Sequence, residues 1–259
     1  MFRTSLLVLS LTAAAATGLV GQSSDFDWRG RLQPGHTIEI RGVNGDIRAE
    51  ASPDASVRVM ADRHGRRSDP SSVRIEVVEH GGGVTICAVY PTPRNARQEN
   101  ECRPGGGTNN TSNNDVQVDF VVQVPANVRF AGQTVNGDIR AEGLRGDALA
   151  ETVNGSVDVY TSGFAEASTV NGNITCRLGR SSFEEDVEFE TVNGSITIEM
   201  PEGLNADFRA TTVNGGIDSD FPILVTGKVS RRSLRGSIGD GGPELRLTTV
   251  NGSIRLRKI

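Results

Sequence analysis

Aromatic residues, lysine, histidine and cysteine are all scarce in this chain of 259 residues. Aromatics make up 5% of the sequence, with one Trp and two Tyr. This scarcity argues against a sugar-cleaving enzyme, because such enzymes use aromatic side chains to hold their substrates. Only Lys228 and Lys258 are lysine among the 27 cationic residues, and the formal charge is −5, so the charge balance does not favour nucleic acid. No Cys-x-x-Cys occurs and the three His residues are scattered, so we expect neither a metal nor another cofactor.

The N-terminus has the features of a secretory signal. Arg3 precedes an eleven-residue apolar run over 6–16, and polar sequence begins at Gln22. The run is too short to span a bilayer, so we predict that residues 1–21 form a signal peptide. No later apolar run is long enough for a transmembrane segment, and we therefore expect a secreted protein of the periplasm or the extracellular space.

A Val-Asn-Gly motif recurs along the chain and dominates its organisation. From Asn136 onward it returns every 16 to 22 residues, counting a degenerate copy over 233–238 in which Arg235 replaces the Asn. This period is typical of solenoid proteins, in which each repeat forms one coil. The asparagines of the motif are Asn44, Asn136, Asn154, Asn171, Asn193, Asn214 and Asn251.

Apolar and polar residues alternate on both sides of each motif. After the motif at Asn193, for example, Ile196 and Ile198 are separated by Thr197. A period of two predicts strands with one buried face. Each repeat is therefore expected to form a strand, an Asn-Gly turn and a second strand. We assign the turn residues a structural role, because Asn and Gly tolerate the left-handed backbone of tight corners and stacked Asn side chains can form amide ladders.

Two all-β folds fit this pattern. Asn-Gly is a strong hairpin signal, so one alternative is an antiparallel β-meander of Asn-Gly hairpins. A parallel coil is favoured, because the same turn recurs once per period and small residues such as Ala148 and Ala165 suit two closely packed sheets. We predict a right-handed parallel β-helix-like solenoid, with an N-terminal β section over 22–125 that has two long loops and a regular array over 126–259.

The three cysteines are expected to be in an oxidising compartment. Cys87 lies in the strand-like run VTICAVY, and Cys102 lies in the polar stretch NECRPGGG. Cys176 shares an inward column of the repeat with Val159 and Ile198. We therefore predict a disulfide between Cys87 and Cys102, with Cys176 as a buried free thiol.

The copies TVNGDI, TVNGSV, TVNGNI and TVNGSI, preceded by a secretory signal, resemble the DUF4097 family. The likeness covers essentially the whole mature chain and includes the segment VDFVVQVPANVRF over 118–130. The resemblance implies a β-helix-like fold and an adhesin-like, β-strand repeat protein. It implies no reaction and no catalytic residues.

We accordingly expect a non-enzymatic binding or structural protein of the cell envelope. The alternative is a carbohydrate-active β-helix enzyme, for which a pair of carboxylates would be needed. Outward carboxylates gather at Glu166, Glu188 and Glu190. Arg209 and Arg232 follow in the same columns, so a solvated face with cross-strand charge pairs explains them better.

Two irregular stretches, over 61–72 and 91–115, concentrate arginine on an otherwise acidic protein. Long loops of this kind are often functional. If the two stretches lie together, they would form a basic patch for an envelope component, either an anionic polymer or a protein. The arginines that we assign to these anion-binding loops are Arg63, Arg66, Arg67, Arg94, Arg97 and Arg103.

Overall fold

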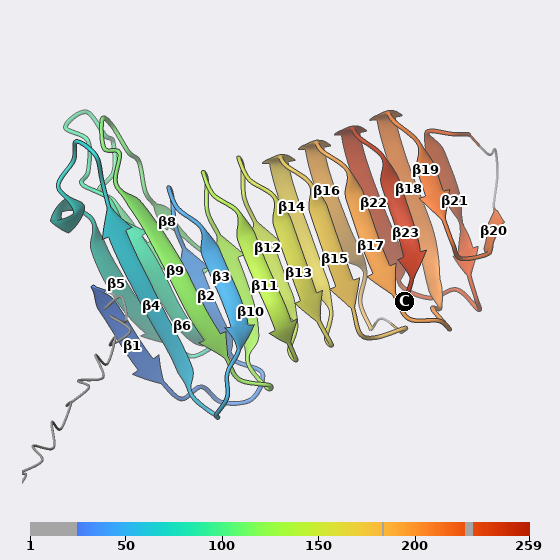
Figure 1. Cartoon of the computed structure of the whole chain (residues 1–259), viewed down its shortest axis with the longest axis horizontal. Helices are drawn as coiled ribbons and strands as arrows, with labels where there is room; N and C mark the ends of the chain where they lie inside the picture. Colours follow the sequence, from blue (N-terminus) through green and yellow to red (C-terminus); the bar gives the residue numbers. More distant parts are fainter. Residues whose placement is uncertain (1–24, 183, 226–229) are drawn as a thin grey trace, which may run out of the picture.

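The computed structural model describes residues 25–182, 184–225 and 230–259, so the predicted signal peptide over 1–21 lies outside the described residues. The described chain is all-β apart from one short 3-10 turn, η1 (Pro70–Ser72). Two long sheets face each other along the length of the molecule (Figure 1). No helix in this part of the chain is long and apolar enough to cross a membrane.

Each long sheet combines strands from distant parts of the chain. In spatial order, sheet A consists of β1 (Phe26–Gly30), β4 (Val57–His64), β9 (Gln117–Val124), β3 (Ile47–Ala51), β11 (Ile139–Leu144), β13 (Val157–Thr161), β15 (Ile174–Leu178), β17 (Ile196–Met200), β23 (Ile254–Lys258) and β19 (Ile217–Ser219). Sheet B consists, again in spatial order, of β20 (Ile223–Val225), β21 (Ser233–Ile238), β18 (Ala206–Asn214), β22 (Glu244–Asn251), β16 (Val187–Asn193), β14 (Ala165–Asn171), β12 (Ala148–Glu151), β10 (Arg129–Gln133), β2 (Thr37–Arg41), β6 (Gly83–Val89) and β5 (Arg74–His80). A small hairpin, β7 (Glu101–Arg103) and β8 (Gly106–Thr108), forms a third sheet.

The two strands of one repeat belong to different sheets and do not pair with each other. β12 pairs in parallel with β10 and β14, whereas β13 pairs in parallel with β11 and β15. Each repeat therefore runs through sheet B, turns at its Thr-Val-Asn-Gly corner and returns through sheet A. The parallel coil is thus present, and the alternative of an antiparallel meander of Asn-Gly hairpins is wrong.

The asparagines of the motif stack into a continuous ladder along one corner. The side-chain amide of Asn154 donates to Asn136 at 2.9 Å, and that of Asn171 donates to Asn154 at 2.8 Å. The same bond links every neighbouring pair in the spatial order Asn44, Asn136, Asn154, Asn171, Asn193, Asn251, Asn214. Each amide in the row thus satisfies the next, which favours parallel, in-register coils.

A second ladder lies just inside the corner and involves the Thr before each Val. Its hydroxyl is buried and donates to the carbonyl oxygen of the motif glycine on the neighbouring coil, as in Thr169 to Gly155 at 2.9 Å and Thr191 to Gly172 at 3.0 Å. A buried hydroxyl without a partner is costly, so this bond explains how Thr can occupy an inward position.

The glycine of the motif is required by close approach between coils. A Cβ atom on Gly172 would collide with the carbonyl oxygen of Gly155, and the same collision recurs along the corner. Our expectation of left-handed backbone at these corners is largely wrong: among the motif glycines of the described chain only Gly45 has a positive φ, and the one non-glycine with positive φ is Asn113.

The residue after each motif glycine also links the coils. The Asp138 side chain accepts the backbone N–H of Ser156 at 2.8 Å, and the Asn173 side chain accepts that of Ser195 at 2.9 Å. This explains why Asp, Asn or Ser occupies the position in the inner coils. Gly216 stands there in the coil that ends sheet A, where no further coil needs an acceptor.

The spatial order of the coils differs from their order in the chain. The C-terminal repeat, β22 and β23, lies between the coil of β16 and β17 and the coil of β18 and β19 (Figure 1). The degenerate copy over 233–238 is not a coil corner at all, because β21 pairs antiparallel with β18 and covers that edge of sheet B. The absence of Asn at Arg235 therefore agrees with a strand that lies outside the stacked corners.

The N-terminal section continues the same two sheets. β2 pairs with β10 and β3 pairs with β11, so the first motif copy stacks on the array. β6 and β9 add one further layer, and the antiparallel strands β5, β4 and β1 complete this end (Figure 1). Sheet B therefore ends at both edges in antiparallel strands, β20 and β5.

The glycine stacking gives a test of the coil. Gly172→Ala should destabilise the protein by about 3 kcal/mol or more, because the added methyl group overlaps backbone that cannot move independently. Gly216→Ala is the matched control: a Cβ there meets nothing within 4 Å, so the change should stay within about 0.5 kcal/mol. Urea unfolding followed by circular dichroism measures both. Equal losses would contradict close stacking at the motif glycine.

Candidate functional site

The stretch over 91–115 contains the hairpin β7–β8, which lies against the outer face of β6. A disulfide joins Cys87 of β6 to Cys102 of β7. These two residues form a small apolar cluster with Val89, separate from the main core. Both faces of β6 are therefore buried, one by the core and the other by the hairpin. Cys176 is a buried free cysteine of the main core.

A buried carboxylate holds the hairpin at a second point. Glu39 of β2 accepts hydrogen bonds from the Gly105 N–H at 3.0 Å, the Thr85 hydroxyl at 2.7 Å and the Arg41 guanidinium at 2.8 Å. Burial alone would raise the pKa of Glu39, but these donors together lower it below the ordinary value. Glu39 is therefore a charged anchor between sheet B and the hairpin turn.

Asparagine side chains fix the two segments that lead into and out of the hairpin. Asn100 donates to the carbonyl oxygens of Tyr90 at 3.0 Å and Asn110 at 2.8 Å. Asn109 accepts the N–H of Tyr90 at 3.1 Å and donates to the carbonyl oxygen of Ala88. The hairpin is thus built into the fold, although the sequence pattern predicted only an irregular loop at this point.

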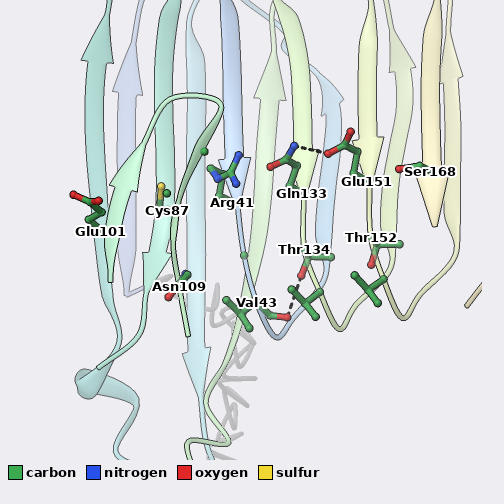
Figure 2. A pocket seen from close by; sticks show the side chains of 15 residues that line it. Arg41, Val43, Cys87, Glu101, Asn109, Gln133, Thr134, Glu151, Thr152 and Ser168 are labelled. Atoms are coloured by element: carbon green, nitrogen blue, oxygen red, sulfur yellow. Dashed lines mark hydrogen bonds between the residues drawn. The ribbon is translucent and has the colours of Figure 1, made fainter. Parts of the chain in front are cut away.

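A cavity of about 410 Å³, which we call the hairpin groove, lies between the hairpin and the outer face of sheet B (Figure 2). Its size is within the range of ligand sites. Figure 2 shows a row of side chains from neighbouring strands along its floor. The groove is lined by Arg41, Gly42, Val43, Cys87, Glu101, Gly106, Gly107, Asn109, Gln133, Thr134, Val135, Glu151, Thr152, Val153 and Ser168.

The polar row of the groove follows the strand register. Arg41 is aligned with Gln133, Gln133 with Glu151, and Glu151 with Ser168, on β2, β10, β12 and β14. The amide of Gln133 donates to the Glu151 carboxylate. Parallel strands lie about 4.7–4.9 Å apart, so the row presents one polar side chain at each such step.

An apolar row runs beside the polar row. The valines of the motif point outward at the corner, and Val43, Val135 and Val153 line the groove. Val135 and Val153 are each 38% exposed, whereas Val43 is only 7% exposed. The valine row continues beyond the groove with Val170 and the later copies of the motif. The groove therefore combines hydrogen-bonding groups and aliphatic surface along one axis.

A second cavity of about 420 Å³ lies at the opposite ends of the same strands, next to the acidic segment 184–186. Glu166 lines it, and burial raises the pKa of Glu166, with the neighbouring carboxylates of Glu188, Glu151 and Glu185 acting in the same direction. The strand next to Glu188 carries Arg246, whose guanidinium lies 3.9 Å from the Glu188 carboxylate.

The neighbour that we predicted for Glu188 on this face is wrong, because the spatial order of the repeats differs from their order in the chain. We expected Arg209 to follow Glu188, but the inserted C-terminal repeat places Arg246 there and Arg209 one strand further on. Glu190 is aligned with Thr248, and Arg232 lies just before β21. Glu151 lines the hairpin groove and Glu166 lines the second cavity.

The arginines of the two irregular stretches have different surroundings. Arg63 lies in β4 and forms an ion pair with Asp25 at 2.8 Å, and Arg103 forms one with Glu101 at 2.8 Å. The other four have no ion pair with an acidic side chain of the described residues; they are Arg66, Arg67, Arg94 and Arg97.

The two irregular stretches do touch. Asp115 accepts the backbone N–H groups of Arg67 and Ser68, and Asn114 donates to Ser72 at 3.2 Å. A carboxylate therefore lies at the junction that we expected to be basic. Within the part of the chain that the structure describes, no group of His, Cys, Asp and Glu is arranged to hold a metal ion.

Sequence reasoning missed Glu39, Gln133 and Glu151 as site residues. A charged or polar residue at an outward strand position is ordinary, and its pattern does not reveal that another segment covers it. The short sequence ECRPGGGT did contain a usable signal, because Pro-Gly between two short segments indicates a turn.

Comparison with known proteins places this architecture in context. The family model described as Toastrack DUF4097 matches residues 36–257. The crystal structure of a proposed cell adhesion protein from Clostridium sporogenes has a TM-score of 0.45 and 10% identity, covering 90% of this chain and 99% of its own. That of a proposed adhesin from Bacteroides fragilis has a TM-score of 0.28 and 10% identity, covering 91% and 98%. No curated protein matches the chain.

The disulfide generates a test of the groove wall. Replacing both Cys87 and Cys102 with Ser should cost about 3 kcal/mol of unfolding free energy, because the bridge closes a short loop of the unfolded chain. It should also make 101–108 sensitive to limited proteolysis while the β-sheet circular dichroism spectrum persists. Reductant should reproduce this in the wild type and have no further effect on the variant. Unchanged proteolysis would show that the bridge does not hold the hairpin.

The raised pKa of Glu166 predicts a pH effect. The native state binds this proton more readily than the unfolded state, so stability should fall as pH rises through the raised native pKa. Glu166→Gln should therefore match the wild type in acid and exceed it at neutral pH by at most about 1 kcal/mol, since solvent screens the site. Urea unfolding across pH measures this. Glu142→Gln, an exposed carboxylate of sheet A, is the control, and a neutral-pH loss in Glu166→Gln would contradict the assignment.

Proposed function

We propose that this protein, which belongs to the Toastrack DUF4097 family, is a secreted, non-enzymatic, adhesin-like binding protein of the cell envelope. Secretion to the periplasm or the extracellular space is proposed from the signal-like sequence over 1–21. We also propose that the coil is right-handed, because connections between parallel strands of a sheet are right-handed in almost all proteins. The hairpin groove is the binding surface in this proposal.

The observation that carries the proposal is the covered groove itself. The coils repeat the same few contacts, whereas the β7–β8 hairpin departs from the repeat and is fixed by both a disulfide and Glu39. Its wall turns an open sheet face into a cavity with polar and aliphatic lining. A wall held at two points supports a binding role, because a preorganised site loses less entropy when a ligand binds.

The arginine stretches support anion binding less well. Arg63 and Arg103 already have carboxylate partners, and Asp115 lies between the two stretches. Arg94 and Arg97 are exposed and remain available for an anionic polymer or protein. Anion binding is therefore kept as a competing outcome of the experiment below.

The experiment measures co-sedimentation of the purified mature protein with isolated bacterial cell envelopes. Gly106→Phe should weaken binding at least tenfold, because Gly106 lines the groove and a side chain there meets open space into which the ring can extend. Gly81→Phe is the matched control in the β5–β6 turn, where a Cβ also meets nothing within 4 Å, and should bind like the wild type.

A third variant separates the groove from the arginine stretches. Replacing Arg94 and Arg97 with Ser should leave binding within about twofold at 0.15 M salt, since exposed ion pairs are weak there. If this variant loses binding and Gly106→Phe does not, the arginines form the site. If the wild type does not bind any envelope preparation, the binding proposal is wrong.

A further inference from the structure

Two of the three charged side chains that line the hairpin groove are already ion-paired within the protein. Arg41 is paired with Glu39 at 2.8 Å, and Glu101 is paired with Arg103 at 2.8 Å. The remaining carboxylate on the floor, Glu151, accepts a hydrogen bond from the Gln133 amide but has no ion pair among the described residues, so it disfavours an anionic ligand. An ionic ligand would have to compete with these partners, whereas an uncharged ligand can use their free lone pairs and N–H groups.

The two rows of the groove give the ligand a shape. Polar side chains and valines advance together from strand to strand, by about 4.7–4.9 Å at each step. A ligand that lies along the groove therefore meets one hydrogen-bonding group per step, and an exposed valine beside the strands β10 and β12. It should have a polar edge, an apolar face and a repeat of similar length.

An extended peptide fits this spacing poorly. A strand rises about 3.3 Å per residue, so side chains on one side recur at about 6.6 Å and drift out of phase with the strands below. A pyranose ring is close in length to one strand spacing. It offers hydroxyl groups at its edges and C–H groups on its faces, which match the polar row and the valines.

We infer that the hairpin groove binds an uncharged, extended glycan chain, with one sugar ring on each of the strands β2, β10, β12 and β14. This inference rests on the proposed function, since it assigns the ligand class of the same groove. Arg41, Gln133, Glu151 and Ser168 hydrogen-bond the hydroxyl groups, and the exposed Val135 and Val153 contact the ring faces. Gly106 and Gly107 leave backbone groups accessible at the opposite wall.

The experiment titrates the purified, oxidised mature protein by calorimetry with uncharged 1,4-linked oligosaccharides: cellohexaose, chitohexaose and mannohexaose. At least one hexamer should bind saturably, and its affinity should change less than twofold between 50 and 500 mM NaCl. Shorter oligosaccharides of the same sugar should be titrated as well. Their affinity should rise with chain length up to about four rings and then level off, because the floor has four strands. No binding by any of the three hexamers overturns the glycan assignment.

Variants locate the bound hexamer. Gln133→Ala should weaken it at least tenfold. Gln123→Ala should leave it unchanged, because Gln123 makes the equivalent bond to Glu50 on the outer face of sheet A, away from the groove. Equal binding by both variants and by Gly106→Phe would overturn the groove as the glycan site.

Two further probes exclude the competing classes. A hexamer of galacturonate and an extended Ser-Thr decapeptide should each bind at least tenfold more weakly than the best neutral hexamer. Tighter binding of either overturns the assignment. Failure of all glycans while Gly106→Phe still reduces envelope binding would reject the ligand class and leave the groove in place, whereas failure of both rejects the proposed function as well.

Discussion

Close contact between neighbouring backbones at one corner is the constraint on which the whole array depends. Only glycine lacks the Cβ that would strike the carbonyl oxygen of the coil beside it, as at Gly172 over Gly155. Once the backbones are that close, the Asn amides can stack and the Thr hydroxyl can reach the same carbonyl oxygen, as Thr169 does. The motif is therefore a set of mutually dependent contacts.

Because every coil presents the same corner, the contacts do not specify which coil lies next to which. The C-terminal repeat can therefore insert between two earlier coils without loss of any ladder. Order must be set elsewhere, at the ends. The coil of β18 and β19 has Gly216 where other coils have an acceptor side chain, and β21 covers its sheet B edge in antiparallel fashion. Both features make that coil a terminal one, as repeat proteins require.

The difference between contacts that every repeat makes and features found only at the ends of the array explains what the sequence predicts well and what it does not. Parity along a strand is a local property, so the inward positions of Ile196, Ile198 and Cys176 could be predicted from period-two alternation. The position of the last repeat depends on which of several similar coils has its edge covered by another strand. No local sequence pattern predicts that position. The groove depends on a hairpin folding back over Glu39, and an outward carboxylate on a strand has the same appearance whether or not another segment covers it.

The same stacking restricts what a binding face on this fold can contain. Outward residues of one column lie at the strand spacing, so identical charges repel one another; the pKa of Glu166 is raised mainly by burial, and the carboxylate of Glu188 beside it acts in the same direction. Some columns avoid this either by alternating sign, as Arg177 beside Glu199 does at 2.6 Å, or by using uncharged side chains, as Gln133 and Ser168 do. Both solutions leave little net charge along the axis. Columns of these two kinds therefore offer a regularly spaced row of hydrogen-bonding groups with little net charge, and that property favours ligands that repeat along their length and carry no charge.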